Sequence, residues 1–196
     1  MRIIAGKHRG RRIISIEGKT IRPTTGKARE AIFSIITSGS FLDENGDSIL
    51  DGAIVADICC GTGAVGLEAL SRGAKQVIFI DSDSGAIQLV KDNLAAFKEE
   101  TSTKALRADA ISLPNAQQRC QVVFIDPPYD SKIVPAILKS LESRNWLAEN
   151  AVIICEVSRM EAPSLPENYR IINERHYGRT KVLILRWQTN PVDVNL

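Results

Sequence analysis

Four short segments of this chain consist almost entirely of apolar residues and show no polar alternation. They are Ala-Ile-Val-Ala at 53–56, Val-Ile-Phe-Ile at 77–80, Val-Val-Phe-Ile at 122–125 and Val-Ile-Ile at 152–154. A strand with one wet face alternates apolar and polar side chains, whereas a strand covered on both faces does not. The pattern therefore predicts a parallel sheet that is sandwiched between helices.

The remaining patterning extends this prediction to a sheet of strands that alternate with helices. We expect strands at 53–57, 76–81, 103–107, 121–125 and 151–157, helices at 64–71, about 83–98 and 134–143, and a weak helix or loop at 110–118. Two last strands, 169–176 and 181–187, should meet at the turn Tyr177-Gly178-Arg179. This order predicts an α/β fold with an open, doubly wound, mostly parallel sheet and an antiparallel C-terminal hairpin.

The N-terminal part differs from the rest in charge. Residues 1–29 hold nine Lys or Arg and one acid, for a formal charge of +8, and the other residues hold 16 basic and 22 acidic side chains, for −6. We expect two short strands at 2–5 and 12–16, a helix capped by Thr25 that runs to about Thr37, and a linker at 39–52. The predicted division is a basic hairpin and helix at 1–38 and a main domain at 39–196. Such an arm suits a polyanion such as RNA, although a solvated hairpin explains the charges equally well.

Glycines and acids cluster where the predicted strands end. Gly61, Gly63 and Gly66 have Gly-x-Gly-x-x-Gly spacing, which allows a tight turn and a close approach of a ligand before a helix begins. Ligands of such sheets bind beyond the carboxyl ends of the strands, and four acids fall there, namely Asp57, Asp81, Asp109 and Asp126. The glycines and Asp81 alone fit a nicotinamide dinucleotide as well as S-adenosylmethionine.

Two acids favour S-adenosylmethionine as the cofactor. Asp57 precedes the glycines, where it would repel a pyrophosphate but could pair with the ammonium group of a methionine moiety. Asp109, followed by Ala110, can accept a hydrogen bond from an adenine amino group. We therefore assign Asp57 and the glycine turn to the methionine end, Asp81 to the ribose, and Asp109 with Ala110 to the adenine.

The segment Asp126-Pro127-Pro128-Tyr129 follows another apolar strand and indicates amine chemistry. The prolines stiffen the turn and remove two backbone donors. The Asp126 carboxylate and the Pro127 carbonyl can accept both protons of an aromatic amine and direct its lone pair at a methyl group. Tyr129 offers a stacking face worth about 1–3 kcal/mol per base. Asp126, Pro127 and Tyr129 are the predicted catalytic group; a Pro-Pro turn with a packed aromatic is the alternative.

Other functional classes find little support. The four cysteines form no Cys-x-x-Cys pair and only two histidines are present, so we expect reduced, buried thiols and no metal site. No apolar run is long enough for a membrane helix, and the N-terminus lacks the pattern of a secretory leader. We therefore expect a cytoplasmic protein that does not associate with membranes, and we infer no obligate protein partner.

Several segments together resemble the bacterial 16S ribosomal RNA guanine-N2 methyltransferases. The similarity includes the opening Met1–Arg12, Arg22-Pro23-Thr24, Arg29–Phe33, Gly61–Gly73, the Asp-Pro-Pro-Tyr segment and Tyr177–Thr180. It implies a Rossmann-like class I methyltransferase that uses S-adenosylmethionine to methylate the N2 amine of a guanine in 16S rRNA within the small ribosomal subunit. Cys59-Cys60 departs from the usual residues of such proteins, and Tyr129 is often Phe there.

The basic arm would then contact RNA phosphates, with little sequence discrimination. The candidate RNA contacts are Arg9, Arg11, Arg22, Lys27 and Arg29, although Arg22 could instead pair with an acid and hold the arm in place.

A nucleic-acid adenine-N6 methyltransferase would use the same Asp-Pro-Pro-Tyr segment and is the main alternative to this function. A nicotinamide-dependent oxidoreductase and a non-catalytic RNA-binding module are further alternatives.

Overall fold

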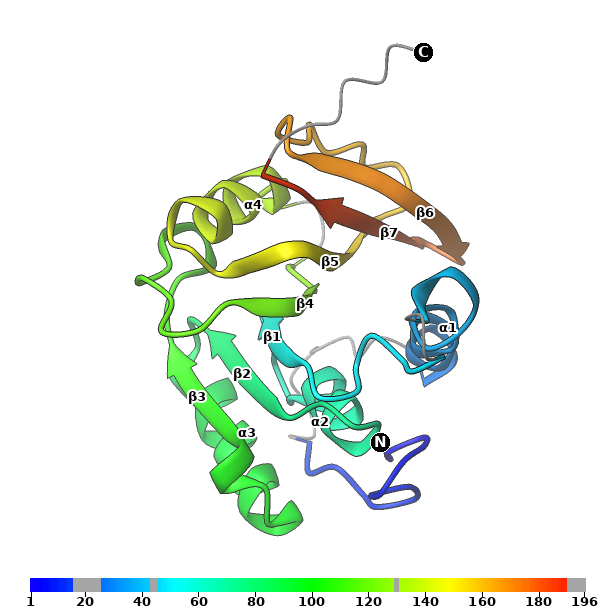
Figure 1. Ribbon diagram of the computed structural model, residues 1–196. Coiled ribbons are helices and arrows are strands. Elements are labelled where there is room, and N and C mark those ends of the chain that lie inside the picture. The colour runs from blue at the N-terminus through cyan, green and yellow to red at the C-terminus, as the bar shows by residue number, and fades with distance from the viewer. Residues whose placement is uncertain (16–25, 43–45, 129–130, 190–196) are drawn as a thin grey trace.

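The protein folds around a seven-stranded sheet with the order β3-β2-β1-β4-β5-β7-β6 (Figure 1). This computed structural model describes residues 1–15, 26–42, 46–128 and 131–189, without the side chains of Lys27 and Ser40. Strands β1 to β5 are parallel to one another, whereas β7 is antiparallel to both β5 and β6. The predicted α/β fold class, with its mostly parallel sheet and antiparallel C-terminal hairpin, is confirmed.

The strands lie close to their predicted positions. Their bounds are Ile54–Ile58 for β1, Gln76–Asp81 for β2, Thr103–Arg107 for β3, Cys120–Ile125 for β4, Leu147–Ser158 for β5, Tyr169–Tyr177 for β6 and Thr180–Trp187 for β7. Strand β5 begins four residues before the predicted 151, because Leu147 already pairs with Cys120 of β4 across an irregularity in the register. Further along, β4 and β5 run in register from Val122 opposite Val152 to Ile125 opposite Cys155.

Helices cover both faces of the sheet, as the apolar strands require. They are α1 at Gly26–Ile36, α2 at Ala64–Ser71, α3 at Ser84–Phe97 and α4 at Val134–Ser143, with short 3-10 turns η1 at Gly39–Phe41, η2 at Glu100–Ser102 and η3 at Ala110–Ser112. Side chains of α1, α2 and α3 share one apolar cluster, and those of α4 and η3 belong to the cluster on the opposite face. The region predicted as a weak helix or loop at 110–118 begins with the turn η3 and contains no α-helix.

The alternation of side chains along the strands decides which residues face α1 and α2. Val55 of β1, Phe124 of β4 and Ile154 of β5 belong to the cluster that contains the α1 side chains. Their chain neighbours Ala56, Val123 and Ile153 belong to the cluster under α4, as expected when successive side chains point to opposite faces. Side chains two positions further along these strands therefore return to the α1 side of the sheet.

The N-terminal segment pairs with itself over a shorter length than predicted. Arg2 and Arg12 form an isolated bridge, and the amide groups of Ile3 and Ile13 donate to the carbonyls of Arg11 and Met1. Ile3 and Ile13 are buried in the same cluster as helix α1, so this hairpin packs on the main body. The predicted cap Thr25 lies outside the described residues, and the domain division at residue 38 stays a prediction.

The segment expected to be a linker contributes to the core. Phe41, in η1, and Leu50 are buried, and Leu42 forms an isolated bridge with Ser48. Polar composition and glycines favour a linker at 39–52, but these two large apolar side chains pack into the cluster that contains α1. The linker prediction is therefore too simple for this segment, since its apolar residues are part of the folded body.

Two further observations concern the described part of the chain as a whole. None of the helices described there has the length and apolar character needed to cross a membrane. The cysteines are free thiols; Cys60, Cys120 and Cys155 are buried, as predicted, whereas Cys59 is only partly buried.

Candidate functional site

The strand order places a crevice at the carboxyl end of β1. The chain passes from β1 outward to β2 and β3 and then returns to β4 on the other side of β1. Ligands of open α/β sheets bind outside the carboxyl ends of the strands at such a reversal. Asp57, near the end of β1, and Asp126, directly after β4, flank this point, which is where the sequence predicts that the cofactor and the amine meet.

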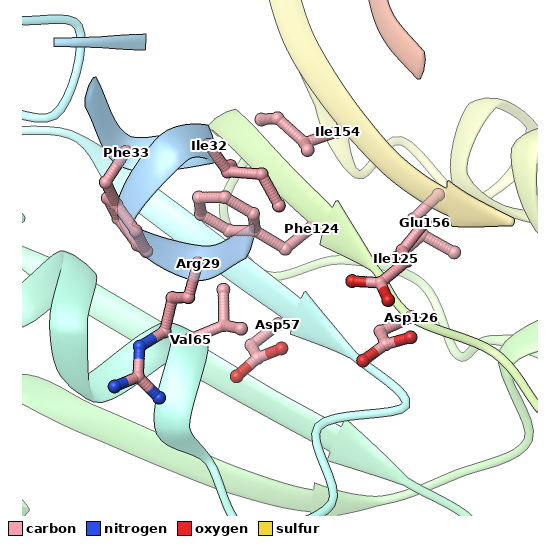
Figure 2. A pocket seen from close by; sticks show the side chains of 10 residues that line it. All are labelled: Arg29, Ile32, Phe33, Asp57, Val65, Phe124, Ile125, Asp126, Ile154 and Glu156. Atoms are coloured by element: carbon pink, nitrogen blue, oxygen red, sulfur yellow. The ribbon is translucent and has the colours of Figure 1, made fainter. Parts of the chain in front are cut away.

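A hollow lies here between helix α1 and the strand ends (Figure 2). The hollow is open to solvent on one side, and the free space between and in front of its walls amounts to about 330 Å³. Its walls come from α1, β1, α2, β4 and β5 and consist of Arg29, Ile32, Phe33, Asp57, Val65, Phe124, Ile125, Asp126, Ile154 and Glu156. One cavity therefore contains both the acid predicted to bind the methionine moiety and the acid predicted to bind the amine.

Asp57 is the buried carboxylate of this site, with 2% of its surface exposed. Its Oδ2 atom accepts a hydrogen bond of 2.9 Å from the amide of Gly66 in helix α2. Burial raises the pKa of Asp57 to about 8, with smaller contributions from the charges of Asp126 and Asp81, while the Gly66 amide acts in the opposite direction. The ionised form of Asp57 is therefore costly unless a positive group pairs with it.

The four acids predicted at the strand ends lie at the same edge of the sheet, where the partly buried Cys59 follows β1. Burial, and after it the charges of Asp81, Asp126, Asp57 and Asp109, raises the pKa of the Cys59 thiol to about 12. The carboxyl ends of β1, β2, β3 and β4 thus form one region that is rich in carboxyl groups. Such a region favours ligands that carry positive charge or hydrogen-bond donors.

The glycine turn supports the close packing of helix α2 on the sheet. Gly63 precedes α2 with φ at +74°, a left-handed conformation that suits glycine. A Cβ atom on Gly66 would lie 2.3 Å from the ring of Phe79 in β2, so only hydrogen fits between helix and strand. The amide of Gly61 donates to Asp81 Oδ2 at 3.0 Å. The turn is thus held both by packing and by the acid predicted to bind ribose.

The two outer acids of the predicted cofactor set also bind backbone amides. Asp81 accepts at its other oxygen from the amide of Asp83 at 2.9 Å. Asp109 caps the turn η3 by accepting from the amide of Ile111 at 3.1 Å, and Ala110 beside it is buried. Each carboxylate oxygen has two lone pairs, so these bonds leave acceptor capacity for a ligand. Their roles toward ribose and adenine stay predictions.

Asp126, the first residue of the predicted catalytic segment, lines the hollow. The amide of Asp126 donates to the carbonyl of Ile58 at 3.2 Å, which ties the start of the turn to β1. Asp126 is partly buried, Pro127 is buried and Pro128 is exposed. Tyr129 lies outside the described residues. The roles of Asp126, Pro127 and Tyr129 stay predictions, but Asp126 lines the same cavity as Asp57.

Glu156 is a residue of the hollow that the sequence predictions missed. It is the only charged residue in the run Ala151–Val157 at the end of β5, and 7% of its surface is exposed. A lone charge within an otherwise apolar strand is a signal that could have identified it, because buried carboxylates are rare. Figure 2 shows its side chain reaching from β5 toward Asp126.

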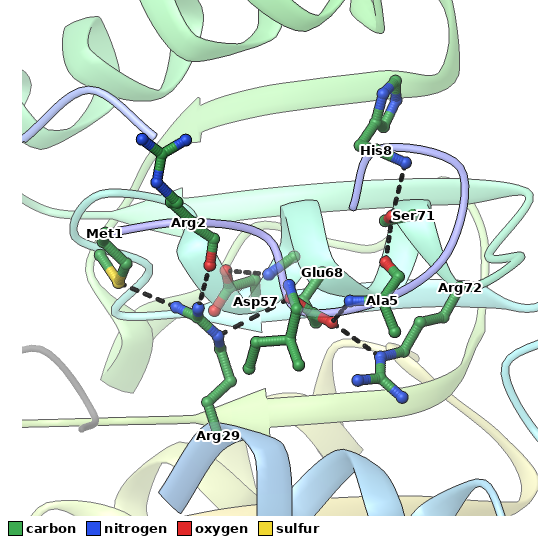
Figure 3. A network of polar contacts seen from close by, with 11 residues as sticks. Met1, Arg2, Ala5, His8, Arg29, Asp57, Glu68, Ser71 and Arg72 are labelled. Atoms are coloured by element: carbon green, nitrogen blue, oxygen red, sulfur yellow. Dashed lines mark hydrogen bonds and ion pairs between the residues drawn. The ribbon is translucent and has the colours of Figure 1, made fainter. Parts of the chain in front are cut away.

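Helix α2 also holds the basic N-terminal hairpin, through the fully buried Glu68 (Figure 3). Its two oxygens accept from the amides of Ile4 at 2.8 Å and Ala5 at 3.0 Å. The guanidinium of Arg72 donates to Glu68 at 2.8 Å, and that of Arg29 lies 3.8 Å away. This arrangement pairs a buried carboxylate with two cations and two backbone donors.

The structure places the predicted RNA contacts in different environments. Arg9 is exposed in the turn of the hairpin, and Arg11 is exposed although its guanidinium lies over the ring of Phe97. Arg29 is 2% exposed and donates to the carbonyl of Arg2 and the sulfur of Met1, so we assign it to holding the hairpin and do not retain it as a phosphate contact. Arg22 and the Lys27 side chain lie outside the described residues.

The residues present fit S-adenosylmethionine. The buried Asp57 carboxylate suits an ammonium group, the glycine turn with its left-handed Gly61 and Gly63 follows directly after β1, and Asp81 and Asp109 offer acceptors to hydroxyl and amino groups. A dinucleotide pyrophosphate would instead meet several carboxylates. Within the ranges that the structure describes, no three His, Cys, Asp or Glu side chains are grouped to hold a metal ion.

The strand order and the site at its reversal define a Rossmann-like class I methyltransferase. A solved structure, "Putative methyltransferase yhhF" from Escherichia coli, matches with a TM-score of 0.81 at 28% identity and covers 97% of this chain and 99% of its own. The chain belongs to the family described as "Conserved hypothetical protein 95", whose model matches residues 1–186.

Curated relatives carry more specific names. The Ribosomal RNA small subunit methyltransferase D of Haemophilus influenzae is 31% identical over 182 residues, which cover 91% of this chain and 89% of that protein. The protein of the same name from Escherichia coli K12 is also 31% identical, over 91% of this chain and 86% of its own length. These relationships favour the methyltransferase interpretation of the glycine turn over the nicotinamide one.

Proposed function

We propose that the protein transfers a methyl group from S-adenosylmethionine to the exocyclic N2 amine of a guanine in 16S rRNA of the small ribosomal subunit. The observation that carries the proposal is the single hollow lined by both Asp57 and Asp126. A methyl donor anchored at Asp57 and an amine held at Asp126 would then face each other across one cavity. The names of the relatives support ribosomal RNA as the substrate.

The cofactor, when bound, supplies an electrophilic methyl group on a sulfonium: the amine nitrogen forms a bond to the methyl carbon, the carbon–sulfur bond breaks, and S-adenosylhomocysteine remains. Asp126 and the Pro127 carbonyl hold the two amine protons and direct the nitrogen lone pair along the line of displacement. The nitrogen then carries one proton too many, and Asp126 accepts it. Asp57, the glycine turn, Asp81 and Asp109 with Ala110 hold the donor.

The base must leave its stack to reach this hollow. Tyr129 follows the acceptor residues directly and is our stacking candidate, and Arg9, Arg11, Arg22 and Lys27 are our phosphate contacts. Positive charge in the arm attracts the RNA, while the acids at the strand ends receive the donor groups of the base and the positive cofactor. A ribosomal RNA substrate also implies a cytoplasmic location.

The decisive experiment incubates the protein with labelled S-adenosylmethionine and small subunits from cells that lack this modification, and then maps the labelled nucleotide. We expect N2-methylguanine in 16S rRNA. N6-methyladenine would establish the alternative, in which the same Asp126 and Pro127 acceptors hold an adenine amine. Absence of label in RNA, with intact binding of S-adenosylhomocysteine, would contradict both.

Substitution separates the roles of the two ends of the hollow. We expect Asp126→Ala to abolish methyl transfer, by more than about a hundredfold, and to change cofactor affinity little, because positioning of the amine is lost. Asp81→Ala should weaken cofactor binding first. Calorimetry with S-adenosylhomocysteine and rate measurements on the same subunits test both. Retention of most activity by Asp126→Ala would remove that residue from the mechanism.

A further inference from the structure

The hollow contains a third carboxylate, on Glu156, that methyl transfer itself does not require. Its position follows from the register of β4 and β5, in which Phe124 lies opposite Ile154 and Ile125 opposite Cys155. Asp126 and Glu156 come one residue beyond the last paired positions. Parallel neighbours lie about 4.8 Å apart, and residues at matching positions point to the same face. Phe124, Ile154, Asp126 and Glu156 all line the hollow, which agrees with this register.

The chemistry of guanine suits two neighbouring carboxylates. Along its Watson–Crick edge, guanine presents the N2 amine and, beside it, the N1–H group, both of which are hydrogen-bond donors. Adenine presents an amine beside an N1 atom that accepts. Flipped bases are read by hydrogen bonds to this edge. A carboxylate next to the one that holds the amine therefore attracts guanine and repels the N1 lone pair of adenine.

We propose that Glu156 is a specificity-determining residue that accepts a hydrogen bond from guanine N1–H while Asp126 and Pro127 hold the N2 amine. The inference rests on the proposed function, because it deepens the description of the same site. Glu156 sits on a paired strand in the middle of the sheet, between β4 and β7, so its backbone is held more rigidly than a loop would allow. Of the other charged side chains lining the hollow, Asp57 faces the glycine turn and Arg29 holds the N-terminal hairpin.

The test compares guanine with 2-aminopurine at the mapped target nucleotide, in small-subunit RNA assembled with a synthetic segment. 2-Aminopurine keeps the reacting amine but replaces N1–H with an acceptor. We expect the wild-type protein to methylate guanine about tenfold to a hundredfold more efficiently, as one correct hydrogen-bonded contact to a base gives. Equal rates on the two bases would overturn the proposal without any variant.

The variant Glu156→Gln provides the second comparison. The side-chain amide of the glutamine can donate a hydrogen bond to N1 of 2-aminopurine, which the carboxylate cannot. We expect the ratio of kcat/KM for guanine to that for 2-aminopurine to fall at least about tenfold relative to wild type. The missing O6 atom of 2-aminopurine affects both proteins alike and cancels from this comparison. Glu156→Asp, which keeps the charge, should keep the preference for guanine at a lower rate. Glu149→Gln, an exposed position on the same strand, should change neither value.

The outcomes separate the two proposals. If wild-type protein produces no N2-methylguanine, the proposed function fails. If it does, and Glu156→Gln keeps the wild-type ratio while its melting temperature stays close to that of the parent, Glu156 has only a structural role and the inference fails. A purely structural role would lower the rates on both bases equally and leave the ratio unchanged.

Discussion

Among single residues, Asp57 combines a structural task with a proposed binding task in one buried carboxylate. One oxygen holds helix α2 through the Gly66 amide, and the group lines the hollow beneath helix α1. In the cofactor-free protein the ionised form of Asp57 is unfavourable, because no positive group in the described site lies close enough to lower its pKa. A ligand with an ammonium group would recover that cost on binding.

This cost predicts a dependence of stability on pH. The folded-state pKa of Asp57 is about 8, above its ordinary value of 3.8, so between these values the folded protein keeps a proton that the unfolded chain has lost. The contribution of Asp57 to the free energy of unfolding therefore falls as pH rises from about 4 to 8 and is constant above that. We expect Asp57→Asn to gain stability relative to wild type across this window, measured by urea unfolding at a series of pH values. A difference that does not vary with pH would contradict the burial argument.

Gly66 offers a test of packing at the same scale. We expect Gly66→Ala to lower the free energy of unfolding by about 1–3 kcal/mol, because the added methyl group overlaps the ring of Phe79. The double variant Gly66→Ala with Phe79→Leu should regain part of the lost stability, because leucine leaves space for the added methyl group. Gly26→Ala is a suitable control, since a Cβ there meets nothing within 4 Å. Urea unfolding of these variants and the wild type measures the differences, and equal losses at the two glycines would refute the explanation.

At the scale of elements, the N-terminal hairpin is held on helix α2 mainly by its backbone. Besides the two bonds to Glu68, the hydroxyl of Ser71 accepts from the amide of His8, and the amide of Lys7 donates to the Ser71 carbonyl. A Cβ atom on Gly6, whose φ is +81°, would lie 1.7 Å from that carbonyl oxygen. The hairpin therefore approaches the helix as closely as backbone allows.

We expect Glu68→Ala to release this hairpin. Removing one member of a buried ion pair leaves the other charges uncompensated and costs about 3–5 kcal/mol. The hairpin contains several Lys and Arg, so limited trypsin digestion should cut within residues 1–15 much faster than in wild type. Exposed Glu167→Ala is the matched control. Unchanged digestion at these sites, with a folded protein, would contradict the role given to Glu68.

The elements that could be predicted from sequence are those whose local pattern agrees with their surroundings. The apolar runs of β1, β2 and β4 are buried on both faces, and the ends of α2 and α4 match their predicted bounds. The burial of Arg29 and Phe41 could not be predicted in this way, because it depends on partners remote in sequence, whereas Glu156 could have been found as the lone charge in its apolar strand. The basic composition of the arm suggests exposure throughout, yet Arg29 lies buried beside an acid. The gathering of acids at one sheet edge, by contrast, followed from topology alone.

At the scale of the whole molecule, charge is divided between a basic arm and an acidic body. This division predicts that RNA affinity falls steeply with salt. Removing a single phosphate contact should reduce the slope of log affinity against log salt concentration by about 0.7–0.9. We expect this reduction for Arg9→Ala, and no change for Arg119→Ala, an exposed position just before β4, at the opposite end of that strand from Asp126. Titrations at several salt concentrations measure both slopes; identical slopes for wild type and Arg9→Ala would remove Arg9 from the interface.

Helix α2 has only eight residues, and its two ends serve different partners. Its first turn is bound to Asp57 through Gly66, and its later part carries Glu68 and Ser71, which hold the hairpin. At about 1.5 Å of rise per residue, Gly66 at the proposed methyl-donor site lies only about 3 Å along the helix axis from Glu68 and about 8 Å from Ser71, which hold the arm. We expect displacement of the arm by a polyanion to reach the proposed donor site through this one short helix, and thermodynamic reciprocity then requires the donor to influence the arm by the same amount.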